Sequence, residues 1–304
     1  MGSYGLPVRS APAFRYLVIC ASGVITALLF GPALRQIVSL GIHSDRYLQI
    51  LIAPLAGGLL LYLERTELLA RPLPSPRIGI ALLSFAVLLG IVSKYAIPRN
   101  AAASLALTVS AMVLVWHAAF LACQGVASFR AAIYPLSCLF LMVPVPLSWL
   151  DRTSTFLQHG SAALAFRILR LTGIPVFRQG MLFSLPGLDF EVGPECSGIH
   201  SSLALMMIAI VAGYLYLRSG WMRAALIVLT VPIALFKNAV RIVAITILGS
   251  RVDRAFIDGP FHHRYGGVLF SLVAAALLVL VLAGLQRLEM RRPHRETGIA
   301  PGTL

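Results

Sequence analysis

The sequence predicts an all-α integral membrane protein with about eight transmembrane helices, an interfacial helix and a short extracytoplasmic loop segment. Of the 304 residues, 59% are hydrophobic and only 12% are charged, and the mean hydropathy is +0.87. A water-exposed domain of this length would carry charge at about a quarter of its positions. The charges also cluster between apolar runs that are long enough to cross ~30 Å of hydrocarbon. A single polytopic membrane domain over residues 1–304 accounts for both observations.

Eight apolar runs of about 17 to 25 residues predict the spans. They lie near residues 17–34, 47–63, 78–93, 103–124, 131–150, 198–217, 222–249 and 267–286. The one long connection, residues 151–195, follows the fifth run, and its length suggests a functional role. Within it, residues 154–171 mix apolar and polar side chains as an interfacial helix does, with a further span as the alternative. Glycines and prolines then delimit two strand-like stretches, 181–185 and 188–192.

The formal net charge of +14 comes from an excess of basic residues. These residues are scattered through short loops, whereas nucleic-acid binding needs a gathered basic face, so no nucleic acid is expected as a partner. More of them flank the span ends on the side of the termini than on the other side, which predicts cytoplasmic termini and a basic cytoplasmic tail at residues 287–304. This excess nearly disappears when the arginines of the long connection are counted. Residues 1–15 lead into the first run without a cleavage pattern, so that span is expected to be retained.

Only one of the four cysteines has a polar neighbourhood. Cys20, Cys123 and Cys138 lie in apolar runs, where cysteine behaves as a small buried hydrophobe. No CxxC pair occurs, which argues against a redox or zinc site, and no metal or cofactor is expected. Cys196 lies where the long connection enters the sixth run, and Pro194 suits a first helical turn. Unpaired N–H groups at a helix start favour a thiolate, so Cys196 is a candidate nucleophile; an interfacial cysteine without function is the alternative.

The seventh run contains three polar residues, Lys237, Asn238 and Arg241. A charge deep in the bilayer costs ~2.5 to 3.5 kcal/mol on insertion scales and needs compensation. Arg241 is eight residues from the outer end of the run, or ~12 Å, so its side chain can extend toward the face that carries Cys196. Asn238 lies on the same helix face, three residues earlier, and can hold the guanidinium. An arginine that anchors to lipid headgroups is the alternative.

Two histidines, His262 and His263, come directly before the eighth run. Surface histidines are the alternative, but three spans would together bring Cys, Arg and His to one depth. A Cys thiolate can attack a peptide carbonyl to form an acyl-thioester, while a His carries protons to the leaving amine and from the acceptor. A guanidinium stays protonated, so an Arg would stabilise the thiolate or the developing oxyanion.

Several motifs together resemble the exosortase/archaeosortase family. They are Pro194-Glu195-Cys196-Ser197-Gly198-Ile199, Asn238-x-x-Arg241, His with glycines before the last span, and upstream Pro144-x-Pro146, Gln158, Gly173-Ile174-Pro175-Val176 and Gln179-Gly180. The resemblance covers residues 130–285 as a catalytic core. Residues 1–126 are less specific, because their spans rest on hydropathy alone.

The resemblance implies a cysteine protease or transpeptidase of the bacterial inner membrane, with its active site on the extracytoplasmic side and no cofactor. Its partners would be membrane lipid and exported proteins that carry a PEP-CTERM-like C-terminal signal: a short motif, a transmembrane helix and a basic tail. The family's catalytic residues map to Cys196, Arg241 and His262, with His263 as the alternative histidine. Many relatives carry Arg or Lys where this chain has His200, which at four residues after Cys196 could itself carry the proton.

Two functions from other classes remain open. Polar residues inside a span are also typical of a membrane transporter, although no internal symmetry accompanies them. A non-catalytic subunit of polysaccharide export is the third hypothesis.

Overall fold

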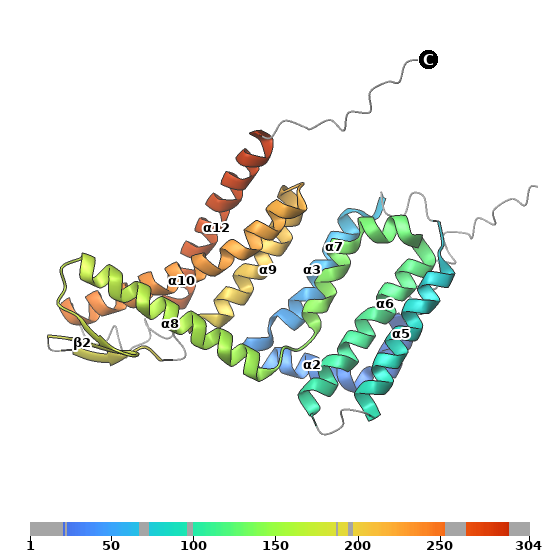
Figure 1. The fold of residues 1–304 in the computed structure, drawn as a ribbon, viewed down its shortest axis with the longest axis horizontal. Helices are drawn as coiled ribbons and strands as arrows, with labels where there is room; N and C mark the ends of the chain where they lie inside the picture. The colour runs from blue at the N-terminus through green and yellow to red at the C-terminus, as the bar shows by residue number, and fades with distance from the viewer. Residues whose placement is uncertain are drawn as a thin grey trace, which may run out of the picture. The chain divides into compact units, whose positions relative to one another are not determined.

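The computed structural model describes residues 21, 23–66, 73–95, 100–186, 188–193, 197–252 and 266–291. They are almost entirely helical, with one small sheet (Figure 1), and the chain divides into two compact units, residues 1–149 and 150–304. Five helices are long and apolar enough to cross a membrane, or up to seven if each of two bent helix pairs forms one span. The all-α integral membrane class is therefore confirmed. The described part of the chain accounts for five to seven of the eight expected spans.

The first unit is a set of helices. They are α2 (Gly31–His43), a 3₁₀ turn (Asp45–Tyr47), α3 (Gln49–Leu63), α5 (Pro76–Tyr95), α6 (Ala101–Ala131), α7 (Ile133–Ser137) and a second 3₁₀ turn (Cys138–Met142). The α5–α6 hairpin is joined by hydroxyl groups, because the buried Ser93 Oγ donates to the Ser104 carbonyl (2.7 Å) and lies 2.8 Å from Thr108 Oγ1. Such bonds supply attraction between helices that the hydrophobic effect does not provide in lipid. Gly125 interrupts α6 with a left-handed φ of +83°.

Two expected spans differ in detail from the helices of this unit. The apolar run at 131–150 does not form one helix, because the chain leaves helical geometry at Val143 and starts the next helix only at Leu147. Pro144 and Pro146 explain the break, since proline lacks an N–H and disfavours helical backbone in the residue before it. The run expected to end at residue 34 continues instead as α2 to His43, after an 86° bend that follows Leu29.

The second unit combines helices with a sheet. Its elements are α8 (Leu147–Leu171), β1 (Phe177–Gln179), β2 (Leu182–Leu185), β3 (Leu188–Glu191), α9 (Ile199–Tyr216), α10 (Gly220–Arg251) and α12 (Gly266–Arg291). The strands form an antiparallel sheet in the order β1-β2-β3. The strand-like stretches expected at 181–185 and 188–192 are thus confirmed to within a residue, while β1 was not predicted.

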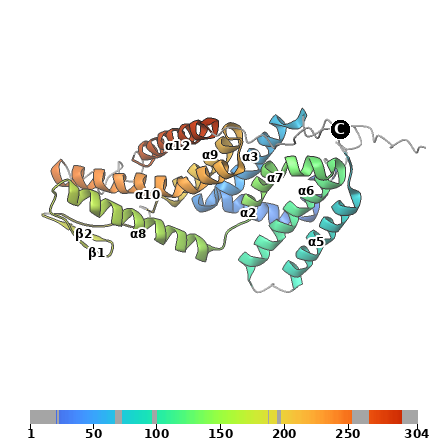
Figure 2. The same cartoon turned by 45° about the horizontal axis from the view of Figure 1, so that its top comes forward.

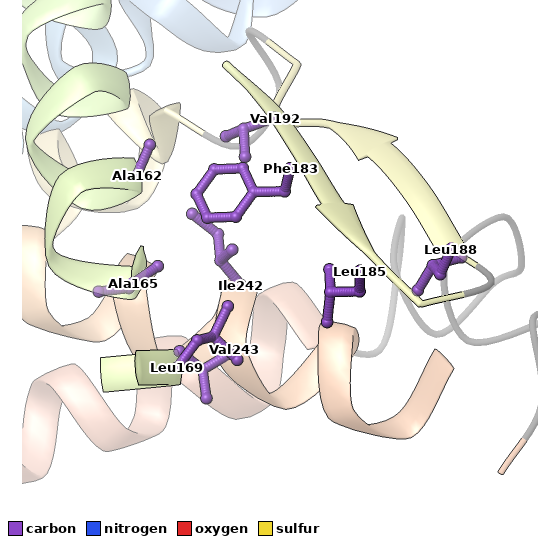
Figure 3. Close-up of a cluster of buried hydrophobic side chains, with 10 residues drawn as sticks. Ala162, Ala165, Leu169, Phe183, Leu185, Leu188, Val192, Ile242 and Val243 are labelled. Carbon is purple, nitrogen blue, oxygen red and sulfur yellow. The ribbon is translucent and has the colours of Figure 1, made fainter. Parts of the chain in front are cut away.

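A compact apolar core joins α8, the sheet and α10 (Figure 3). It consists of Ala162, Ala165, Leu169, Phe183, Leu185, Leu188, Val192, Ala239, Ile242 and Val243. Phe183 is fully buried and its ring stacks on Phe190 with centroids 5.3 Å apart. In both Figure 1 and Figure 2, α8 runs alongside the second half of α10. The amphipathic pattern expected for 154–171 is confirmed, because the buried residues of α8 form one stripe and its arginines at 152, 167 and 170 are exposed.

The other end of α10 is fixed by α12. The Glu289 carboxylate accepts the backbone N–H groups of Arg218 (3.0 Å) and Ser219 (2.5 Å). The Gln286 side chain donates to the Tyr216 carbonyl at 3.3 Å. Free N–H groups at a helix start attract a negative charge, so Glu289 holds the turn between α9 and α10 in place.

Candidate functional site

The predicted site falls partly outside the described residues. Cys196 lies there, as do His262 and His263, while Asn238, Arg241 and His200 are described. What the structure defines is the framework on both sides of Cys196, up to Gly193 and from Ser197 onward. The arrangement of the thiol, the guanidinium and the imidazole at one point therefore stays a prediction.

Two amide side chains, the partly buried Gln158 and the buried Asn238, hold the chain before and after Cys196. On the upstream side, Gln158 Nε2 of α8 donates to the Val192 carbonyl at 2.6 Å, and the Val192 N–H donates to the Met181 carbonyl at 3.0 Å. On the downstream side, Asn238 Nδ2 of α10 donates to the Ser197 carbonyl at 2.7 Å. Val192, Ser197 and Asn238 are all at most 2% exposed. The four residues from 193 to 196 thus connect two fixed points.

A glycine makes the downstream contact possible. Gly198 precedes α9 as its N-cap, with φ +63° and ψ 24°, a left-handed conformation that favours glycine. A Cβ on this residue would lie 2.3 Å from Asn238 Nδ2 and 2.4 Å from Oδ1. The helix α9 begins at Ile199, three residues after Cys196, and Pro194 lies outside the described residues, so its place in a first helical turn stays a prediction.

The first turn of α9 is further fixed through its hydroxyl groups. The Gly198 carbonyl accepts hydrogen bonds from Ser201 Oγ (3.0 Å) and Ser202 Oγ (2.8 Å). The ammonium group of Lys237, which is 3% exposed, donates in turn to Ser201 Oγ. Neighbouring residues of α10, Lys237 and Asn238, therefore hold the two carbonyl groups that follow Cys196, one directly and one through a serine.

The sequence shows Lys237 as a charge in an apolar run and Gln158 as part of a motif, but it places neither residue in the site. The available signal was chemical: an ammonium group in an apolar run needs a partner. The partner itself, Ser201, is 36 residues away, and no pattern within the sequence connects the two.

Arg241 lies one helical turn beyond Asn238, and its side chain is partly buried. With 18 residues, α9 is ~27 Å long and matches the hydrocarbon thickness. Because Asn238 contacts Ser197, two residues before α9 begins, Arg241 lies beyond the start of that helix, next to Ile242 of the core with α8 and the sheet. Protein packing therefore explains the apolar residues around Arg241, and its expected depth in the membrane stays a prediction.

His200 lies in the first turn of α9 with an exposed side chain. It takes no part in the buried hydrogen bonds described above and lies four residues after Cys196 in the sequence. Within the described residues, no group of three or more His, Cys, Asp or Glu side chains could hold a metal ion.

Comparison with known proteins identifies the family. The family model described as transmembrane exosortase matches residues 41–279. This range includes α3, α5 to α10 and half of α12, and it begins upstream of the region where the motifs are found. Neither curated proteins nor solved structures gave a match. Since the family model covers well over half of the sequence, including every candidate site residue, the chain belongs to the transmembrane exosortase family.

Proposed function

We propose that this protein is a cysteine-dependent membrane protease or transpeptidase that removes C-terminal sorting signals from exported proteins. Membership of the exosortase family suggests a sorting transpeptidase. The observation that carries the proposal is the support on both sides of Cys196: Gln158 fixes the Val192 carbonyl and Asn238 fixes the Ser197 carbonyl. A covalent nucleophile needs this kind of restraint, because attack requires the reacting atoms at a defined distance and angle.

In the proposed reaction, the Cys196 thiolate adds to the scissile carbonyl, and the C–N bond breaks to leave an acyl-thioester. The guanidinium of Arg241 stabilises the anionic oxygen of the tetrahedral intermediate. His262, with His263 or His200 as alternatives, protonates the departing amine and then removes a proton from the acceptor. The acceptor, whether water, a lipid or a sugar amine, attacks the thioester, and the C–S bond breaks to regenerate the Cys196 thiolate and the protonated histidine.

The position of the framework suits a substrate with a transmembrane signal. Ser197 and Asn238 lie at the start of α9, a helix whose length matches the thickness of the hydrocarbon. A sorting signal could diffuse within the bilayer and present a PEP-CTERM-like motif at this level. We place the site on the extracytoplasmic side of the bacterial inner membrane, with both termini in the cytoplasm. The transporter hypothesis is less favoured, because Lys237 and Asn238, halfway along α10, have hydrogen-bond partners within the protein, the Ser201 hydroxyl and the Ser197 carbonyl.

The test is processing of a tagged substrate that carries a short Pro-Glu-Pro motif, a transmembrane helix and a basic tail. In cells with Cys196→Ala or Cys196→Ser, the substrate should accumulate with its signal attached. Cys123→Ala, at a half-buried cysteine of α6, is the matched control and should process normally. Normal cleavage by Cys196→Ala would refute the mechanism. Mass spectrometry of the mature C-terminus would identify the acceptor.

A further inference from the structure

The contacts of Lys237 suggest a role in the reaction. Its ammonium group is almost completely buried at the start of α9. Within the described residues, its partner is the hydroxyl of Ser201 and no carboxylate pairs with it. A buried cation without a negative partner is energetically costly, so its position calls for an anion nearby. Just ahead of α9, Glu195 and Cys196, both outside the described residues, are the groups that could supply one.

The choice of residue is also unusual for this chain. Of its 25 basic residues, only Lys94 and Lys237 are lysines, and the others are arginines. Lys94 is exposed at the end of α5, whereas Lys237 is 3% exposed. An ammonium is a compact charge that can donate to a hydroxyl in a narrow space, where the planar guanidinium would need more room.

The hydrogen bonds lead from this charge toward Cys196. Lys237 Nζ donates to Ser201 Oγ, and Ser201 Oγ donates to the carbonyl of Gly198, which is two residues after Cys196. Asn238 donates to the carbonyl between them, that of Ser197. The carbonyl groups of Ser197 and Gly198 are thus both linked to α10, one by Asn238 and the other by Lys237 through Ser201. These bonds fix the turn before α9, and the ammonium group adds a positive charge next to it.

We propose that Lys237 is a positioning residue of this site: acting with Ser201, it holds the turn after Cys196 and supplies the buried positive charge that favours the Cys196 thiolate. The inference rests on the proposed function, in which Cys196 is the nucleophile. Thiolates form where a nearby cation and a helix start stabilise the negative charge.

Other charged groups lie on α8, β3, α9 and α10, and Glu195, next to Cys196, lies outside the described residues. Arg241 follows on α10 and is the second cation near Lys237. His200 on α9, His159 on α8 and both acidic residues of β3 are exposed to solvent. Solvent screens exposed charges strongly, so the buried ammonium should have the larger effect on a neighbouring anion.

A purely structural role and the proposed role predict different results for Lys237→Met. Methionine removes the charge while Ser201 Oγ can still donate to the Gly198 carbonyl, so the turn keeps its hydrogen bond. Replacement of a buried charge by an apolar side chain of similar size is often neutral or stabilising. The variant should therefore fold, and any loss of reactivity would report on the charge.

The experiment measures the rate of alkylation of Cys196 by iodoacetamide against pH, read by peptide mass spectrometry on the full-length protein in detergent. Lys237→Met should move the pH of half-maximal rate upward by about one unit, which lowers processing near neutral pH about tenfold and restores it at higher pH. Lys237→Arg keeps the charge and should keep a midpoint closer to that of the wild type. Lys94→Met is the matched control and should change nothing.

Each outcome separates the two proposals. If alkylation of Cys196 in the wild type leaves processing intact, the proposed function fails. If alkylation abolishes processing but Lys237→Met has the midpoint of the wild type, the inference about Lys237 alone is refuted. Should Lys237→Met not fold, Lys237→Gln provides the second test: it removes the charge but keeps an N–H donor for Ser201 Oγ, and a midpoint equal to that of the wild type would again overturn the inference.

Discussion

Substitution of Gly198 by alanine tests the contact between α9 and α10 with a single methyl group. The backbone at this position is left-handed, which costs a residue with a Cβ ~1 to 2 kcal/mol. The added Cβ would also lie 2.3 Å from Asn238 Nδ2. A tolerable contact of ~3.4 Å requires Asn238 to move by ~1 Å, because the backbone of α9 is fixed by its own hydrogen bonds.

That movement removes the hydrogen bond to Ser197. The distance from Asn238 Nδ2 to the Ser197 carbonyl, now 2.7 Å, would exceed 3.5 Å. A buried carbonyl without a partner costs about 1 to 3 kcal/mol. The two effects together predict that Gly198→Ala lowers the free energy of unfolding by about 2 to 5 kcal/mol.

A matched control separates the backbone strain from the clash. Gly180 has the same φ of +63°, but a Cβ there would meet nothing within 4 Å. Gly180→Ala should therefore cost only the backbone term, about 1 to 2 kcal/mol. In unfolding titrations with SDS in mixed micelles, the two variants should differ by the energy of the lost hydrogen bond.

A double variant completes the test. In Gly198→Ala with Asn238→Ala, the clash is gone and only the strain and the lost hydrogen bond remain. The double variant should therefore be about as stable as Gly198→Ala alone, with a coupling of ~1 to 3 kcal/mol. Equal stabilities of Gly198→Ala and Gly180→Ala, or additive effects in the cycle, would refute the reasoning.

Two further predictions concern regions away from the site. Glu289→Ala leaves two N–H groups at the start of α10 without their acceptor, so it should lower the free energy of unfolding by about 1 to 3 kcal/mol. Glu191→Ala, at an exposed strand position, is the control and should change this free energy little. Equal effects of the two variants in the same SDS titration would contradict the role given to Glu289. Gly125→Ala would place a Cβ 1.7 Å from the Leu73 carbonyl oxygen and should abolish folding of the first unit, measured as loss of folded protein in detergent extracts, whereas Gly58→Ala meets open space and should be tolerated.

Hydropathy located most helices because helix length and apolar composition reflect the same physical constraint, the thickness of the hydrocarbon. The runs expected at 198–217, 222–249 and 267–286 correspond closely to α9, α10 and α12. Hydropathy does not locate the helix ends where prolines break an apolar run, as at residues 143–146. Hydropathy is averaged over a window of residues, so a single missing N–H group does not change it.

The candidate site shows a second limit of sequence reasoning. Residues around Arg241 are apolar because they pack on Phe183 and α8, and a run of this composition looks the same whether it faces lipid or protein. The pairing of Lys237 with Ser201 and the left-handed backbone of Gly198 are tertiary features. The motif contained these residues, but only the packing of α9 on α10 gives them partners.

Hydrogen bonds hold both ends of α9 and thereby restrict its length. The Glu289 carboxylate binds the backbone just after the helix, and the Asn238 side chain binds the Ser197 carbonyl just before it. The helix between these two contacts has 18 residues. An inserted residue would lengthen α9 by ~1.5 Å and rotate one end relative to the other by ~100°, so that the hydrogen bonds at only one end could be kept. The residue count of α9 therefore sets the distance between the two hydrogen-bonded segments at its ends, Ser197 before the helix and Arg218–Ser219 after it.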